Sequence, residues 1–486
     1  MRQWFTSEVH VSWRLVALAA GVIVGTAGSL VSPAVLGDDL FAVIACTAGF
    51  LAMMWRYRWV AVAAFLAGAL FGAWRGTGQQ ELLRLYEPYL GQVVTLRGVL
   101  HEDAALGAHG DQRLVLGHVA IAGQDLPGET WISSTKADVK RGDVITVRGK
   151  LEQGFGTFPA TMYRAGINTI QRPRPGDVAR VIRDGFAAAV RLGVAEPNAS
   201  LGVGFLTGQR STLPADLDEQ LRVVGLTHAV VASGYNLTIL VAFARSALQR
   251  FSKYLATMAA GGMVLAFMGI TGLSPSMSRA GLVAGLGLLA WYYGRSLHPF
   301  VLLPVAAAVT LIVRPSYVWG DIGWYLSFLA FAGVIVLGPL LRRYFWEPGH
   351  NPPAVIQLVI DTIAAQAATL PIILFCFGQF ATYALLANLL VLPLVPLAMV
   401  LTFAAGLGGL LMPGIAAVIG LPAQWLLGYM VWVVGTVADL PGAQEEISFG
   451  GGWLVAGYLI LSLLSLYLWR KTGLDFRADS DIAKTI

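Results

Sequence analysis

Charged residues are scarce in this chain. Only 13% of its 486 residues are Asp, Glu, Lys or Arg, whereas 56% are hydrophobic. Soluble domains carry roughly 25% charged residues, so this composition excludes an ordinary soluble fold. Apolar runs of about 20 residues, the length that crosses a bilayer, recur along the chain. The composition therefore predicts a polytopic α-helical membrane protein.

Cysteine and nucleotide-binding motifs are also scarce. The two cysteines, Cys46 and Cys376, lie in apolar runs. We expect both to be small buried hydrophobic residues, and they give no support for a disulfide framework or a cysteine-based metal site. The phosphate-binding sequence Gly-x-x-x-x-Gly-Lys-Ser/Thr is missing. No cofactor is expected, and any energy source is a partner ATPase or the membrane potential.

The apolar runs predict about twelve spans with both termini in the cytoplasm. Arg2 and Arg14 precede the first span, which is expected to be a signal anchor. Most basic loops then fall on the cytoplasmic side, as the positive-inside rule requires, and Arg279 and Arg314 are exceptions. The predicted spans are residues 15–33, 39–55, 59–74, 223–243, 255–272, 279–293, 299–313, 321–341, 355–376, 382–411, 415–437 and 451–469.

Residues 79–178 do not resemble a membrane segment. Short β-rich runs at 92–100, 112–121, 129–134 and 143–151 are separated by turn signals. Several short strands in this length predict an inserted small β-barrel of the oligonucleotide-binding (OB) type, on the extracytoplasmic side. Its 11 basic and 11 acidic residues cancel, and between residues 92 and 153 only Trp131 is aromatic. A spacer or gating role is therefore expected at least as much as DNA binding.

The remaining boundaries follow from composition. Apolar residues at helical spacing in 178–192 predict an amphipathic helix suited to the membrane interface. The predicted domains are N-terminal membrane helices (1–78), the OB-like domain (79–178), amphipathic or interfacial helices (179–222), a channel domain (223–471) and a cytoplasmic tail (472–486).

The most informative stretch is 206–240, where polar residues interrupt an apolar run. They are His228, Ser233, Gly234 and Asn236. Polar groups at membrane depth are costly unless they are satisfied, so they usually face a cavity or another polar group. Ser-Gly in the middle of a run also permits a broken helix, which membranes tolerate where it lines a water-filled space. Four such positions within nine residues predict the lining of a pore or site.

Several segments, taken in order, resemble the ComEC family of competence proteins. TMYRAGI (161–167) is similar to the stretch that leaves the family's OB domain. The other matching segments are GQRSTLP (208–214), LRVVGLTHAVVASGYN (221–236), SPSMSRAGLVAGL (274–286), DIGWYLSFLAFAGV (321–334) and AAQAATLPIILFCFGQFATYALLANLLVLPLVP (364–396).

The resemblance implies a multi-pass inner-membrane channel that passes single-stranded DNA into the cytoplasm during natural transformation or related DNA transfer. The partners that it implies are an extracytoplasmic DNA-delivery protein, a cytoplasmic helicase or ATPase, and the lipid bilayer. There are two departures from the family. Asn236 stands where the family often has a second histidine, and no histidine follows His350. Many members of the family carry a metallo-β-lactamase-like nuclease domain, which needs a His/Asp cluster to hold its metal ions. The chain therefore resembles either a short form without enzyme activity, whose nuclease is a separate protein, or a divergent paralogue.

We therefore hypothesise that a path for DNA is lined by His228, Ser233, Gly234, Asn236 and Arg279. A polyanion needs water, hydrogen-bond donors and modest positive potential along its way. Four further polar residues in the matching segments are expected to support this lining: Asp321, Ser327, Gln366 and Asn388.

Alternatives remain at the level of residues and of function. Arg279 is equally compatible with an arginine that snorkels at a helix start, Asp321 with a helix N-cap, and Gln366 and Asn388 with interhelical hydrogen bonds. A secondary transporter of a small anion or lipid would also need polar residues at the midplane. An intramembrane enzyme that uses His228 and Ser233 is disfavoured, because residues five apart do not share a helix face well.

Overall fold

The computed structural model describes residues 10–30, 43–49, 59–106, 111–135, 137–173, 176–230, 234–272, 275–294, 298–346, 352–447, 450–474 and 476. The chain divides into two compact units. The first comprises Met1–Val178 and Phe300–Tyr325, and the second comprises Ala179–Pro299 and Leu326–Ile486. Ser233, one of the predicted lining residues, lies outside the described residues.

The helices of the first unit pack through small residues. A Cβ at Gly25 or at Gly68 would overlap the backbone of the facing helix, so the two helices can approach closely only because these positions lack side chains. The Arg75 Nε donates a 3.0 Å hydrogen bond to the carbonyl of Ile312 and satisfies one of the free carbonyls at that helix end. The helices are α2 (Val11–Gly28), α4 (Trp59–Leu83), α12 (Pro299–Val313), α13 (Tyr317–Gly320) and the start of α14 (Ile322–Phe345).

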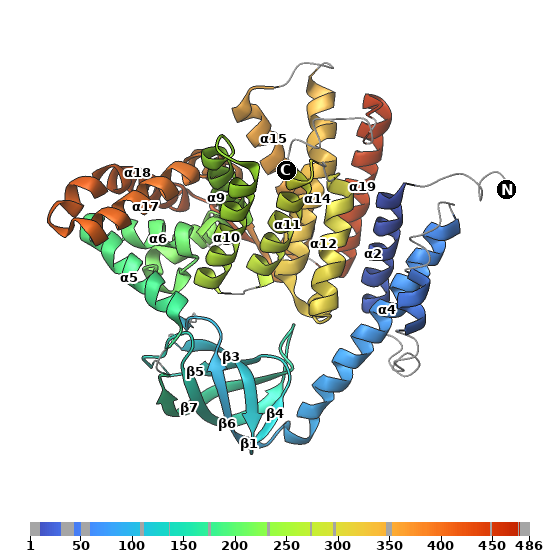
Figure 1. Ribbon diagram of the computed structural model, residues 1–486, viewed down its shortest axis with the longest axis horizontal. Coiled ribbons are helices and arrows are strands. Elements are labelled where there is room, and N and C mark those ends of the chain that lie inside the picture. The colour runs from blue at the N-terminus through green and yellow to red at the C-terminus, as the bar shows by residue number, and fades with distance from the viewer. Residues whose placement is uncertain are drawn as a thin grey trace. The chain divides into compact units, whose positions relative to one another are not determined.

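A closed five-stranded barrel forms the rest of this unit (Figure 1). Around the ring β1 pairs with β3, β3 with β5, β5 with β7, β7 with β6 and β6 with β1. Only the β5–β7 pairing is parallel. This is the Greek-key arrangement of an OB fold. The strands are β1 (Val93–Leu100), β2 (Ala105–Leu106), β3 (Gln112–Ile121), β4 (Gln124–Leu126), β5 (Thr130–Ser134), β6 (Val144–Gln153) and β7 (Ala160–Gln171).

The barrel confirms the predicted β-rich runs and adds one strand. All four runs correspond to strands of the ring, namely β1, β3, β5 and β6. The fifth strand, β7, was not predicted from the sequence. Two irregularities in its pairing with β6 disturb the alternation of buried and exposed residues that normally marks a strand.

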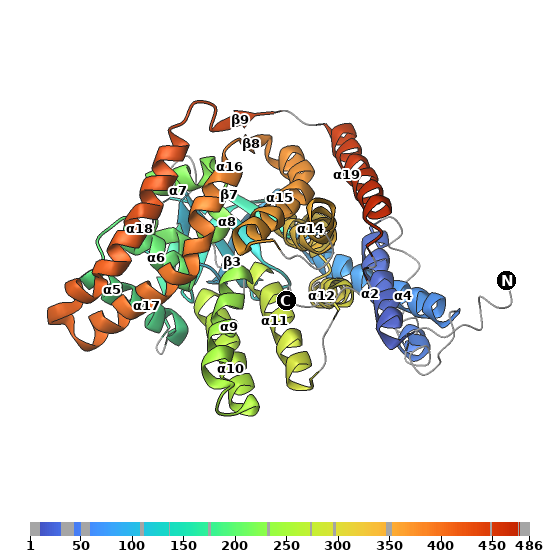
Figure 2. The ribbon, with the colours of Figure 1, turned by 90° about the horizontal axis from the view of Figure 1, so that it is seen from above.

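The second unit is helical, and its core surrounds α6, which is almost entirely buried. Figure 2 shows α6 beside α17 and α18, both of which contact it. The helices are α5 (Val178–Gly193), α6 (Asn198–Thr207), α7 (Ala215–Val223), α8 (Thr227–Val230), α9 (Gly234–Leu248), α10 (Lys253–Thr271), α11 (Pro275–Tyr292), the rest of α14, α15 (Ala354–Phe377), α16 (Ala384–Val391), α17 (Val395–Leu411), α18 (Ala416–Ala438) and α19 (Gly451–Thr472).

Eight helices of the described chain are long and apolar enough to cross a membrane. Two further predicted spans correspond to shorter apolar helices, Asn236–Leu248 and Pro299–Val313. Most of the predicted span 39–55 falls outside the described residues. The predicted number of about twelve is therefore not confirmed. The eight segments are Val11–Gly28, Trp59–Tyr89, Lys253–Thr271, Ile322–Phe345, Val355–Phe377, Ala384–Leu411, Pro413–Ala438 and Gly451–Thr472.

Two features of the surface differ from those of a soluble protein, because apolar side chains are exposed there. Cys46 and Cys376 are exposed, so the prediction that they are buried was wrong. A helix surface that faces lipid is as apolar as a core, and an apolar run cannot distinguish the two. On α5 the arrangement is reversed as well: Val181 and Ile182 are exposed, whereas Arg180 and Arg183 are buried. An outward apolar face of this kind suits contact with lipid.

Candidate functional site

The helix that the sequence predicts across 223–243 is interrupted near its start. α7 ends at Val223, and Gly225 follows with a φ of 73°, the left-handed conformation that favours glycine. The helix α8 follows, and the described part of the chain resumes in α9 at Gly234. The Ser-Gly break expected from the sequence involves Ser233, which lies outside the described residues, and it stays a prediction.

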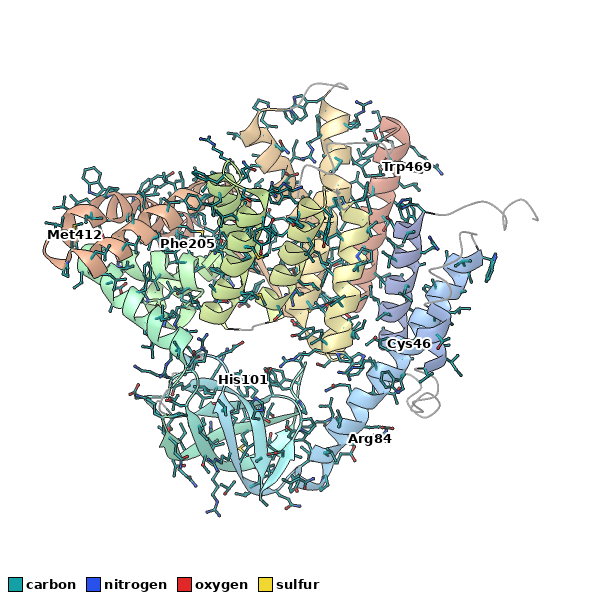
Figure 3. The ribbon with its side chains drawn as sticks, viewed as in Figure 1. Cys46, Arg84, His101, Phe205, Met412 and Trp469 are labelled. Atoms are coloured by element: carbon teal, nitrogen blue, oxygen red, sulfur yellow. The ribbon has the colours of Figure 1, made fainter. Side chains whose placement is uncertain are left out.

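Asn236 joins three segments at this break. Its side chain is fully buried. The Nδ2 group donates a 3.0 Å hydrogen bond to the carbonyl of Phe205 on α6 and a longer one, 3.5 Å, to the carbonyl of Ala229 on α8. Figure 3 marks Phe205 within the second unit. Asn236 therefore holds the start of α9 against the central helix.

His228 lies on α8, one turn after Gly225. Its side chain is exposed, and its Nδ1 lies 3.0 Å from the carbonyl oxygen of Gly225. A carbonyl only accepts, so the imidazole is placed to donate from Nδ1 and to leave Nε2 as an acceptor. Of the predicted lining residues that the structure describes, His228 is the exposed one.

Arg279 lies on α11, directly before Ala280, which is close to Gly234 on α9. A Cβ at Gly234 would lie 3.3 Å from the Cβ of Ala280, so α9 and α11 are in contact there. Arg279 itself is only 3% exposed. A cation buried to this degree among apolar helices does not match the snorkelling alternative, in which the guanidinium reaches water.

Asn388 lies on α16, the helix whose first residue is close to Gly225. A Cβ at Gly225 would lie 3.2 Å from the Cβ of Ala384, and Asn388 follows Ala384 by four residues, on the same face of the helix. Asn388 is 3% exposed, and its Oδ1 has no donor among the described residues. A buried amide oxygen without a donor costs about 1–3 kcal/mol. This position is therefore maintained at a cost to stability.

Three predicted supporting residues are not brought to this break. Asp321 belongs to the first unit, where its Oδ1 accepts a 3.0 Å hydrogen bond from the backbone N–H of Trp324 and caps α14. This matches the N-cap alternative. Ser327 is exposed on α14, and Gln366 is half-buried on α15. No described contact joins either of them to α8 or α9, and their roles stay predictions.

The structure adds polar groups that sequence reasoning missed. Thr402 on α17 is fully buried. Its Oγ1 would lie only 2.6 Å from a Cβ added to Gly202 of α6. Gln209, just after α6, donates to Asp184 at 3.4 Å, and its Oε1 has no donor among the described residues. The signal for both was a hydroxyl or amide within or beside an apolar run, which is too common to single out one residue.

The first unit has a separate polar cluster in which the charges are paired. The guanidinium of Arg314 donates hydrogen bonds of 2.6 and 3.1 Å to the carboxylate of Glu129. The His101 Nδ1 lies 3.0 Å from the same carboxylate (Figure 3 marks His101). Burial would raise the pKa of Glu129, but the hydrogen bonds from His101 and Arg314 outweigh it and lower that pKa to about 2. Arg314, which the predicted topology makes an exception to the positive-inside rule, is thus held by the barrel.

Chemically, these arrangements can hold and orient a polar partner. No group of three His, Cys, Asp or Glu side chains in the described part of the chain could hold a metal ion. The break in the second unit combines hydrogen-bond donors, a buried guanidinium and an accessible imidazole. These are groups that contact a polar or anionic chain passing among helices.

Fold and site together define a polytopic membrane protein with polar groups gathered at a broken helix. A family model described as Competence protein matches residues 205–472. That match covers more than half of the chain, so the chain belongs to this family, as the resemblance to the ComEC proteins indicated.

A curated relative is ComE operon protein 3 of Bacillus subtilis (strain 168). It is 24% identical over 203 residues, which are 40% of this chain and 25% of the relative. The matched part thus spans a quarter of the relative's length. No solved structure matches the chain.

Proposed function

We propose that the chain takes part in DNA uptake during competence and that its second unit conducts single-stranded DNA across the inner membrane. The observation that carries the proposal is the helix interruption at Gly225, together with Asn236, Arg279 and Asn388, which are buried on α9, α11 and α16. All of them lie within the residues that match the competence family. Broken helices in membranes are tolerated where the freed polar groups serve a passage.

The passage requires movement. Asn236, Arg279 and Asn388 are buried in this structure, and a polynucleotide is far wider than the gaps between packed helices. The helices that meet at the break must therefore separate when DNA passes. Gly225 and Gly234 lack side chains where the methyl groups of Ala384 and Ala280 approach them, so these are the points at which we expect the helices to separate.

The arrangement of the chain in the membrane is part of the same proposal. Residues 1–78 and 223–471 form the membrane domain, 79–178 the extracytoplasmic barrel, 179–222 the interfacial helices and 472–486 a cytoplasmic tail. Both termini are cytoplasmic. An extracytoplasmic protein delivers the DNA, a cytoplasmic helicase or ATPase pulls it, and a separate nuclease degrades the other strand. The pairing of Arg314 with Glu129 supports this topology, because it gives the basic residue a reason to stay outside.

The test is the import of labelled DNA into the cytoplasm. We expect a deletion strain to import none, and His228→Ala and Arg279→Ala to reduce import at least about tenfold, the effect of losing roughly 1.4 kcal/mol of interaction with the passing strand. Membrane abundance must stay unchanged. Arg250→Ala is the matched control, because Arg250 is an exposed arginine between α9 and α10. Normal import in the deletion strain would refute the function, and normal import in both variants would refute the lining.

A further inference from the structure

The barrel carries a cluster of aromatic side chains on one face. The ring of Trp131 on β5 lies 5.5 Å from that of Phe155 and 5.4 Å from that of Tyr163. Phe158, in the turn between β6 and β7, lies 5.7 Å from Phe155. Phe155 is 49% exposed and Tyr163 is 51% exposed. Large aromatic surface left uncovered on a single face indicates a contact with something outside the barrel.

Two independent contacts turn this face toward the membrane segments of the same unit. Glu129 and Trp131 are two residues apart and point to the same side of the barrel wall, while Thr130 between them is buried. Glu129 binds Arg314, the residue directly after α12. Gly156, next to Phe155, packs so closely on Gly320 that a Cβ on Gly320 would overlap its backbone.

These contacts set the depth of the aromatic cluster. Gly320 is two residues before the start of α14, one of the helices long and apolar enough to cross a membrane. Each headgroup layer of a bilayer is about 5–8 Å thick. Phe155 is therefore next to the residues of the same unit that lead into α14, and Trp and Tyr side chains are enriched at the ends of membrane-spanning helices.

We propose that Trp131, Phe155, Phe158 and Tyr163 seat the barrel in the phospholipid headgroup layer. The cluster is a lipid contact that fixes the height and tilt of the barrel over the membrane. Single-stranded nucleic acid is the competing occupant, because its bases also stack on aromatic rings. Such binding depends on positive charge along the groove, and the 11 basic and 11 acidic residues of 79–178 cancel. The charge favours lipid.

The proposal can be tested with a spin label at Phe155. Replacing Cys46 and Cys376, the only two cysteines, with serine gives a background for Phe155→Cys in the full chain. In nanodiscs of phosphatidylethanolamine and phosphatidylglycerol, collisions of the nitroxide with oxygen and with a water-soluble nickel chelate report its depth. The matched control is Thr95→Cys, an exposed site on β1, which lies across the strand ring from β5.

We expect the ratio of oxygen to nickel collisions at Phe155 to exceed that at Thr95 at least about twofold, as for a site in the headgroup layer. Tyr163→Cys should behave as Phe155→Cys does, which guards against a local effect of one label. Equal ratios at all three sites would overturn the proposal. It would also be overturned if oligothymidylate immobilised the labels at Phe155 and Tyr163, because nucleic acid would then be the occupant. Neither outcome depends on DNA import.

Discussion

The two units differ in the kind of buried polar group that defines each of their sites. In the barrel unit buried charges are matched: the fully buried Asp143 accepts a 3.0 Å hydrogen bond from Arg172, and Glu129 is held by Arg314 and His101. In the helical unit, the buried oxygens of Asn388 and Thr402 have no donor among the described residues.

Polar groups with partners and polar groups without partners have different consequences for the fold. A satisfied buried ion pair specifies a geometry, whereas an unsatisfied acceptor weakens the fold and is tolerated where another role maintains it. On the proposed function, we expect the barrel's polar groups to serve positioning and the polar groups near the helix interruption to serve transport.

The largest effect on stability is expected for Asn236→Leu. Leucine removes the donor that serves the carbonyls of Phe205 and Ala229, and a buried carbonyl left without a donor costs roughly 1–3 kcal/mol. The melting temperature in detergent should fall clearly. Thr238→Val, an exposed position on the same helix, is the control and should melt like the parent. An unchanged melting temperature for Asn236→Leu would show that Asn236 does not join these segments.

A smaller loss is expected for Glu129→Gln. The neutral amide keeps the shape but loses the charge-assisted bonds to Arg314, which is partly exposed, so the cost is about 1 kcal/mol. Proteolysis of the junction between barrel and α12 should become faster. Asp125→Asn changes an exposed carboxylate of the same barrel and should leave the rate unchanged.

The same carboxylate predicts a dependence on pH. Its pKa is lowered in the folded protein to about 2 from an ordinary value of 4.5. The stability that it contributes is therefore fully present above about pH 4.5 and is lost as the pH falls toward 2. Acid titration of unfolding should show a part of the transition that disappears in Glu129→Gln. A titration identical in parent and variant would contradict the ion pair.

No loss of stability is expected for Asn388→Leu, because its Oδ1 has no donor to lose and removing a buried unsatisfied acceptor is neutral or stabilising. DNA import should nevertheless fall. A variant that melts normally and transports poorly would sharpen the contrast between the units. If Asn388→Leu melts far below the parent, Asn388 is structural, and the contrast fails.

Much of the barrel could be predicted from the sequence because its strands follow local rules. Alternating residues and turn signals marked β1, β3, β5 and β6, while the irregular pairing of β7 hid the fifth strand. The grouping of Trp131 with Phe155 and Tyr163 was beyond prediction. It depends on a parallel pairing between strands distant in sequence.

The candidate site was predictable in its positions but not in its contacts. Polar residues in an apolar run marked His228 and Asn236, since their cost in a membrane is general. Which face each helix turns inward is decided by packing between helices, so Ser327 proved exposed and Asp321 proved to be a cap. The cysteines show the same limit, because apolar sequence does not distinguish lipid from core.

The most direct test locks the break shut. In the background without native cysteines, Gly234→Cys and Ala280→Cys place two Cβ atoms about 3.3 Å apart, close enough for a disulfide after a small adjustment. If DNA passes where these helices separate, oxidation of the double variant will abolish import and reduction will restore it, while each single variant imports DNA under both conditions. Undiminished import by the oxidised double variant, with the cross-link verified, would contradict the account.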